Sequence, residues 1–172
     1  WGHASQVHAI ALLMAAALHA EFDLAHLISG SDWPIQAKAA RLARWDGKCQ
    51  IEARPLVQQE RMMGYWIDSR FARASDTPFY PWRLRRFVRR LNQSLPVRAD
   101  SPWGPWHKGS SWWSLTPPAY QIIYPEICRA LKAGRLFATL CADEHLIQTI
   151  MAQHMPDAIS GNARRTTLWD AG

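Results

Sequence analysis

The stretch 109-GSSWWSLTPPAYQIIYPEICRALKAG-134 decides the fold, because it changes from the pattern of a strand to that of a helix within a few residues. Its 112-WWSLT-116 segment is a predicted strand. The residues that follow, 117–134, read as a helical region, and Gly134 suits the C-terminal cap of that helix. We therefore expect a strand and a helix in direct succession.

Further helices and strands are predicted on both sides of this unit. We expect helices over about 4–20, 35–44 and 143–153, with Pro34 placed to suit the first turn of the second. We expect strands over 23–30, 48–56, 63–70 and 164–170, the first of them buried. The Pro, Trp and Gly cluster at 95–111 indicates a long ordered loop. Strands that alternate with helices indicate an α/β layer fold.

Composition places the chain among globular proteins. Its 172 residues fit one domain, 48% of them are apolar and 20% are charged. The longest apolar run, 9-AIALLMAAAL-18, is too short to cross a bilayer, so we interpret it as a buried helix. Cys49, Cys128 and Cys141 form no recognisable spacing, which favours a reducing compartment over a disulfide framework. We expect a cytoplasmic protein, with peripheral association with a membrane left open.

The formal charge of +6 is concentrated in 83-RLRRFVRRLNQSLPVR-98. Leu84, Phe87, Val88 and Leu91 recur there at helical spacing, and arginines fill the remaining faces. Such a helix suits a phosphate backbone or an anionic substrate. Solvated arginines that pair with acids elsewhere are the simpler interpretation.

Acidic side chains occur at two places where an enzyme could use them. Asp32 follows the predicted strand 23–30 in a Gly-Ser-Asp sequence, at the edge where α/β folds bind ligands, although Ser-Asp is also a good turn and helix cap. Asp143 and Glu144 open a predicted helix, whose dipole keeps a carboxylate ionised. An ionised carboxylate can take a proton from an attacking hydroxyl, but an acid in a first turn is commonly only a cap. His145 projects about 100° away, which makes a pair with Glu144 unexpected.

Ten tryptophans point to the type of ligand. Indole faces stack on the apolar faces of sugar rings, and core packing accounts for only about half of these residues. The sequence lacks a Gly-rich phosphate loop, a G-x-S-x-G elbow, a Cys-x-x-Cys pair and a His-Glu-x-x-His motif, which sets aside those classes of enzyme. A metal site has little support, because the histidines are scattered. Hydrolysis by two carboxylates would need a second acid, for which Asp32 is the conceivable partner of Glu144.

Five blocks of sequence resemble a known family when taken in order. They are Trp-Gly-x-Ala-Ser at 1–5, Leu-Ile-Ser-Gly-Ser-Asp-Trp-Pro-Ile at 27–35, Gly-Ser-Ser-Trp-Trp-Ser-Leu-Thr at 109–116, Asp-Glu-His at 143–145 and Arg-Arg-Thr-Thr-Leu-Trp at 164–169. This order resembles glycosyltransferase family 14, in a bacterial form. The family contains the core-2/I-branching β-1,6-N-acetylglucosaminyltransferases and the peptide O-xylosyltransferases. The resemblance spans nearly the whole chain.

The resemblance implies a GT-A-type fold, that of the nucleotide-diphospho-sugar transferases, with a mixed sheet flanked by helices. It also implies inverting transfer of N-acetylglucosamine or xylose from a UDP-sugar to a hydroxyl of a glycan or protein acceptor. No metal or other cofactor is expected, because the family does not require a divalent metal. Glu144 matches the family's general base, which deprotonates the acceptor hydroxyl.

Acceptor contacts are also implied by position in the family's blocks. The matching residues are Asp32, Trp33, Trp112, Trp113 and Trp169. Basic residues between the blocks help to bind acceptor in the family, which makes Arg86 and Arg90 candidates, although that segment is not aligned residue by residue. The residues that bind the nucleotide are not assigned.

The chain departs from the family at its ends. In the family, the first nucleotide-binding half precedes the Trp-Gly block, and the basic residues that neutralise UDP follow the strand of Trp169. We therefore expect residues 1–172 to be a single partial domain, cut at both ends, that forms the acceptor-side half with the catalytic base. Cys141 and Ala142 also replace the small or proline positions usual before the acid pair.

Two other functions remain open. A non-catalytic carbohydrate-binding fragment would keep the tryptophans and would not depend on Glu144. A basic nucleic-acid-binding protein would depend on the arginines at 83–90 and would show a steep dependence on salt. A glycosyltransferase would have a UDP-sugar and a glycan or glycoconjugate as partners, without nucleic acid.

Overall fold

A computed structural model describes most of the chain between residues 4 and 164. The described residues are 4–30, 32–35, 37–56, 60–66, 86–87, 90–91, 94–96, 98 and 101–164. The helices are α1 (Ala4–Ala17), α2 (Lys38–Ala43), α3 (Glu60–Met63), α6 (Pro117–Lys132) and α7 (Leu146–His154), with 3-10 turns η1 (Ala142–Glu144) and η2 (Pro156–Ala158). The strands are β1 (Ala25–Leu27), β2 (Arg54–Pro55), β3 (His107–Lys108) and β4 (Trp113–Leu115).

The strands form two small antiparallel pairs, so the architecture is mixed α/β. Strand β1 pairs with β4, and Leu27 lies opposite Trp113. Strand β2 pairs with β3, and Arg54 lies opposite Lys108. An isolated bridge between Gln50 and Ser114 adds a further contact to β4.

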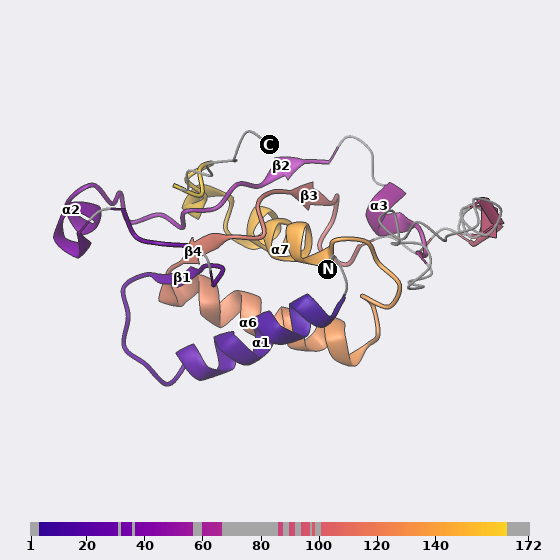
Figure 1. Ribbon diagram of the computed structural model, residues 1–172, viewed down its shortest axis with the longest axis horizontal. Helices are drawn as coiled ribbons and strands as arrows, with labels where there is room; N and C mark the ends of the chain where they lie inside the picture. Colours follow the sequence, from indigo (N-terminus) through magenta and orange to yellow (C-terminus); the bar gives the residue numbers. More distant parts are fainter. Residues whose placement is uncertain are drawn as a thin grey trace, which may run out of the picture.

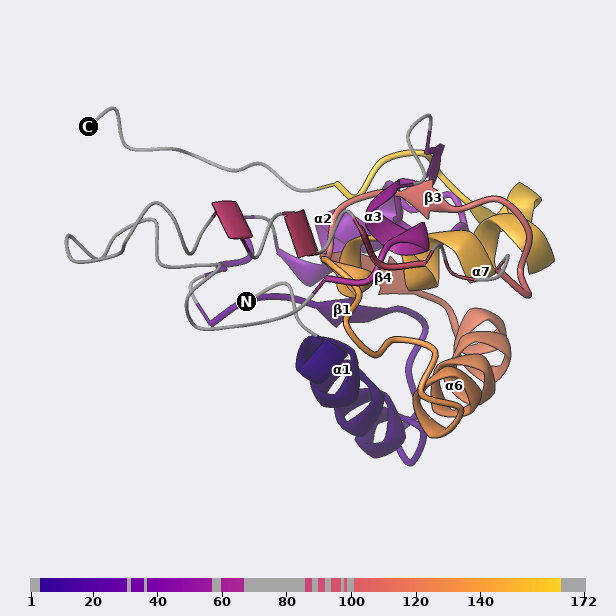
Figure 2. The same cartoon turned by 90° about the vertical axis from the view of Figure 1, so that its right-hand side faces the viewer.

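Helices α1 and α6 lie on one side of the β1–β4 pair (Figures 1 and 2). Figures 1 and 2 both show α1 and α6 next to one another beneath the β1–β4 pair, with the β2–β3 pair on the opposite side. Helix α7 contacts both α6 and β3, and therefore joins the two parts of the molecule.

The unit formed by β4 and α6 confirms the prediction made for 112–134. All three residues of β4 are buried, and α6 buries a stripe that matches the helical period. The stripe consists of Ala119, Tyr120, Ile123, Ile127 and Ala130, and it packs against α1. The helix ends as expected, since Gly134 follows the cap with a φ of 65°, where glycine is favoured.

The prediction of a buried helix and a buried strand near the N-terminus is only half right. Helix α1 buries Val7, Ile10 and Met14 against α6, but Leu12 and Leu13 on its other face are exposed. Almost every residue of α1 is apolar, so composition alone did not reveal which face meets the core. Strand β1 has three residues and none of them is fully buried, because it lies at the edge of its sheet.

Two other predicted elements are shorter than expected. Helix α2 begins at Lys38, so Pro34 is not in its first turn; Trp33 and Ile35 are exposed, and without burial a short helix gains little from further turns. The strand predicted over 48–56 is reduced to β2, where Pro55 cannot donate a ladder hydrogen bond.

Three predictions near 63–70, 95–111 and 143–170 have mixed outcomes. Met63 belongs to α3 and no strand occurs over 64–66, while 67–70 lie outside the described residues. The expected loop over 95–111 contains the short strand β3. The helix predicted over 143–153 is present as η1 and α7, and most of the strand predicted over 164–170 falls outside the described residues.

Within the described part of the chain, no helix combines the length and apolar character that a bilayer crossing requires.

Candidate functional site

Two of the sequence blocks meet in space. The backbone amide of Gly109 donates to the carbonyl oxygen of Glu144 over 3.0 Å. The hydroxyl of Ser111 donates to Oδ2 of Asp143 over 2.6 Å, and Nε2 of Gln148 donates to the carbonyl oxygen of Ser110 over 2.7 Å. We call this junction, formed by residues 108–111 with Asp143, Glu144 and Gln148, the acid corner.

Gly109 makes the close approach possible. A β-carbon at this position would overlap the carbonyl oxygen of Glu52 and would lie 3.0 Å from Cγ of Gln148. The backbone of Glu52 cannot move aside as a flexible side chain could. Only glycine therefore allows the 109–111 segment to lie between the chain that leads into β2 and helix α7.

The two acids of the corner have different environments. Asp143 is only 5% exposed, accepts the hydrogen bond from Ser111, and its buried Oδ1 has no hydrogen-bond partner among the described residues. The side chain of Glu144 is 20% exposed, and its Oε2 lies 3.6 Å from Nζ of Lys108, which is itself open to solvent. Asp143 thus links its turn to the segment of Ser111, whereas the carboxylate of Glu144 is open to solvent.

The backbone that carries the acids departs from regular helix. Cys141 has a φ of 55°, a left-handed conformation that is uncommon for a residue with a side chain. The single turn η1 follows, and α7 starts only at Leu146. The buried His145 stands between them and donates from Nδ1 to the carbonyl oxygen of Cys141 over 2.7 Å. His145 therefore faces the interior while Glu144 faces outward, which agrees with the prediction that they form no pair.

Arg98 supports the segment that leads into the acid corner. Its guanidinium donates from Nε to the carbonyl oxygen of Gly64 over 3.1 Å, from one terminal nitrogen to Arg135 over 3.1 Å, and from the other to Phe137. It also lies 4.0 Å from the ring centre of Tyr65. Partial burial lowers the pKa of Arg98, but an arginine with a lowered pKa is still charged at neutral pH.

The paired tryptophans do not act alike. Trp113 is 2% exposed and packs edge-on against Tyr120, with ring centres 6.2 Å apart. Trp113 is the first residue of a buried strand, and its indole lies in the core. In this structure Trp113 therefore cannot make the acceptor contact predicted for it. Trp112 is partly exposed, next to Ser111 of the acid corner. Of the two, only Trp112 offers a surface to a sugar.

Asp32 and Trp33 lie in the loop that leads to α2. Asp32 accepts a hydrogen bond from the amide of Ser29 over 2.6 Å, which is the turn geometry that the sequence offered as the alternative. Trp33 is 85% exposed. Figure 1 shows α2 at the left edge of the molecule, away from α7.

The remaining predicted acceptor residues are Arg86, Arg90 and Trp169. Arg86 and Arg90 are exposed in a helical segment that Figure 1 shows at the right edge, beyond α3. Trp169 lies outside the described residues. In the ranges that the structure describes, no three His, Cys, Asp or Glu side chains gather closely enough to hold a metal ion.

Sequence reasoning missed the residues that orient the acids. Gly109 and Ser111 stand in a block that was already singled out, and a glycine and a serine beside a buried acid are a signal that could have been used. Lys108 and Arg98 carry no such signal, because their partners lie more than thirty residues away. No protein-family model matches the chain, and a search of curated proteins finds no relative.

Proposed function

We propose that this chain is the acceptor-side part of a GT-A-type, inverting glycosyltransferase of the cytoplasm, with Glu144 as its general base. The observation that carries the proposal is the division between the two acids of the acid corner. Asp143 is buried and bonded to Ser111, while Glu144 is held at the surface beside Lys108. A base must be accessible to the acceptor and held in position, and Glu144 is the member of the pair with these properties.

The reaction follows from this position. An acceptor hydroxyl donates a hydrogen bond to the carboxylate of Glu144, which removes the proton as the oxygen attacks the anomeric carbon of a UDP-sugar. The new carbon–oxygen bond forms on the face opposite the departing UDP, so the configuration inverts. The ammonium of Lys108 lies 3.6 Å from Oε2 of Glu144 and orients the carboxylate before the acceptor arrives. Trp112 supplies an indole beside Ser111 on which the acceptor sugar stacks.

The test is acceptor-dependent release of UDP. The chain is incubated in EDTA with UDP-N-acetylglucosamine or UDP-xylose and a panel of glycans and serine-containing peptides. We expect one pair to give release, and Glu144→Gln to reduce the rate by about 10²- to 10⁴-fold. Glu52→Gln is the matched control, because Glu52 is also partly exposed and lies 3.6 Å from an arginine, Arg54.

Other outcomes would assign a different function. Sugar binding without UDP release, unchanged in Glu144→Gln, would identify a carbohydrate-binding fragment; the exposed Trp33 and the partly exposed Trp112 favour this as the second candidate. Binding to RNA or DNA that falls steeply with salt would identify a nucleic-acid-binding protein that uses the arginines at 83–90. Either result would contradict the proposed transfer.

A further inference from the structure

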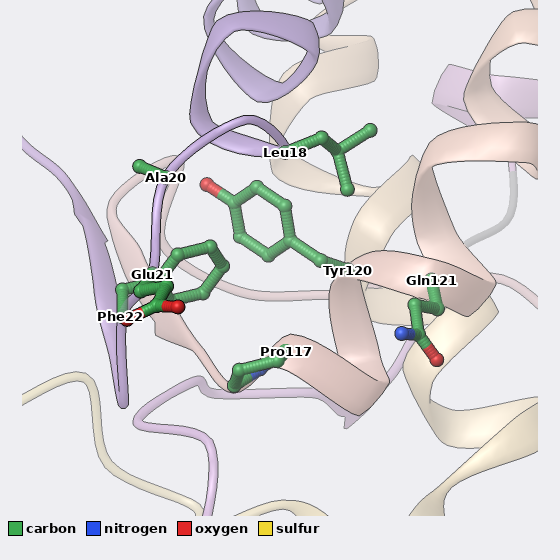
Figure 3. A pocket seen from close by; sticks show the side chains of 7 residues that line it. All are labelled: Leu18, Ala20, Glu21, Phe22, Pro117, Tyr120 and Gln121. Carbon is green, nitrogen blue, oxygen red and sulfur yellow. The ribbon is translucent and has the colours of Figure 1, made fainter.

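A concave site lies between the end of α1 and the start of α6. It has a volume of about 310 Å³, at the lower end of the range of small-molecule pockets. Leu18 and Phe22 line it from the turn that follows α1, and Pro117 and Tyr120 line it from the first turn of α6 (Figure 3). None of its lining residues belongs to the acid corner, so this is a separate site.

The walls of the pocket are largely apolar and aromatic. The rings of Phe22 and Tyr120 meet edge to face, with centres 5.1 Å apart. Phe22 is only partly buried and Leu18 is exposed, so both present apolar surface to whatever enters. These side chains suit a compact ligand with an apolar face.

One largely buried residue presents a polar group to this apolar site. Tyr120 is only 5% exposed, and no described residue forms a hydrogen bond with its hydroxyl. Figure 3 shows the hydroxyl directed toward the turn that carries Ala20, at the mouth of the pocket. Burial raises the pKa of Tyr120, so the phenol stays neutral and can both donate and accept a hydrogen bond. Because no described residue occupies this hydroxyl, a ligand in the pocket can form a hydrogen bond with it.

Two further polar side chains complete the set. Glu21 provides a carboxylate and Gln121 an amide, and both line the pocket from opposite elements. A cationic ligand would use only the carboxylate. A sugar ring carries several hydroxyls, and the phenol, the amide and the carboxylate can each form a hydrogen bond with one of them.

We propose that the pocket between α1 and α6 binds one neutral sugar ring, with its apolar face on Phe22 and its hydroxyls bonded to Tyr120, Glu21 and Gln121. The site makes no covalent change to the sugar. It would give the protein a second point of contact with a glycan, apart from the acid corner. The inference does not depend on transferase activity, because a binding protein could use the pocket in the same way.

Ligand-observed NMR with glucose, xylose and N-acetylglucosamine, each added to the full chain, tests the proposal. Trp112→Ala is introduced throughout to remove sugar contacts at the acid corner. We expect at least one sugar to bind in this background, and Tyr120→Phe to weaken its binding about fivefold or more, because one hydrogen bond is lost while the ring remains. Tyr124→Phe, the same change on the same helix outside the pocket, should leave binding unchanged.

Three results would overturn the proposal. The first is the absence of sugar binding to the folded Trp112→Ala protein. The second is equal sugar binding by the Trp112→Ala protein with and without Tyr120→Phe. The third is binding of benzylamine, an aromatic cation, when none of the sugars binds. Circular dichroism and the thermal midpoint establish that Tyr120→Phe is folded. UDP release by Tyr120→Phe is expected to match the unmodified chain if the acid corner is active, so failure of one site does not imply failure of the other.

Discussion

The β4–α6 unit and the segment 135–145 lie next to one another in the chain but are stabilised in different ways. The first follows its local sequence: a buried strand, a helix with one apolar stripe, and a glycine at its end. The second contains two residues with left-handed backbone, Ala138 and Cys141, and only a single 3-10 turn. Its shape depends on contacts from distant residues.

The difference shows where the molecule keeps its candidate chemistry. Strained backbone persists only where surrounding contacts enforce it, and such places are enriched at functional sites. Arg98 bonds to the carbonyls at 135 and 137, and Ser111 bonds to Asp143. We infer that these tertiary contacts position Glu144, and that local sequence preference does not.

Gly109→Ala should have the largest effect on stability. The β-carbon of the new alanine would overlap the backbone of Glu52, so the acid corner and the chain that leads into β2 must move apart. We expect a loss of about 3 kcal/mol in the free energy of unfolding, measured by urea denaturation. Gly30→Ala is the control, since no atom lies within 4 Å of its β-carbon position. Equal stability of the two variants would show that the corner is not tightly packed.

Arg98→Lys should have the second largest effect on stability. Lysine cannot reach the three carbonyl groups that the guanidinium bonds, and we expect a loss of about 2 kcal/mol. Arg129→Lys on α6 is the matched change in the locally determined unit. It affects one surface pair with Glu126 and should cost less than about 0.5 kcal/mol. Similar losses in the two variants would remove the contrast between the regions.

Ala138→Gly should not lower the free energy of unfolding, although a change from alanine to glycine usually does. Ala138 has a φ of 51°, and relief of that conformation offsets the extra freedom of the unfolded chain. We expect a change between zero and a gain of about 1 kcal/mol. Ala16→Gly, at an exposed position in α1, should instead lose about 1 kcal/mol. Thermal unfolding of both proteins compares them directly, and an equal loss would mean that Ala138 is not strained.

The smallest effect should be seen in how the free energy of unfolding depends on acidic pH. Burial raises the pKa of Glu126, but hydrogen bonds from Trp103 and Arg129 outweigh it and lower the pKa below its usual value of 4.5. A carboxyl with a lowered pKa in the folded protein adds stability above pH 4.5, and that stability is lost as pH falls through the lowered value. We expect Trp103→Phe to shrink this acid-dependent loss by a few tenths of a kcal/mol. An unchanged pH profile would show that the bond contributes nothing.

The sequence predicted the parts that obey local rules. The helical region predicted over 117–134, with Gly134 at its C-terminal cap, corresponds to α6, and Gly134 has the positive φ that such a cap requires. The sequence places the acid pair at the start of a helix and in one of the blocks, and the choice of Glu144 as general base stays a prediction. The structure adds that Glu144 has a partly exposed side chain, whereas Asp143 is buried. The exposed face of α1 and the burial of Trp113 could not be predicted. Almost all residues of α1 are apolar, and Trp113 stands beside a second tryptophan, so only packing decides which side chain faces the core.

The most direct test of the division between the two acids is the rate of UDP release per folded molecule in Glu144→Gln and Asp143→Ala. Asp143→Ala should lower the free energy of unfolding by about 2 kcal/mol, because it removes the buried partner of Ser111. The folded fraction should release UDP more slowly, because that bond helps to position Glu144, but it should keep measurable activity. Glu144→Gln should unfold like the unmodified chain and lose its activity. Transfer that survives in Glu144→Gln and disappears in folded Asp143→Ala would contradict the account.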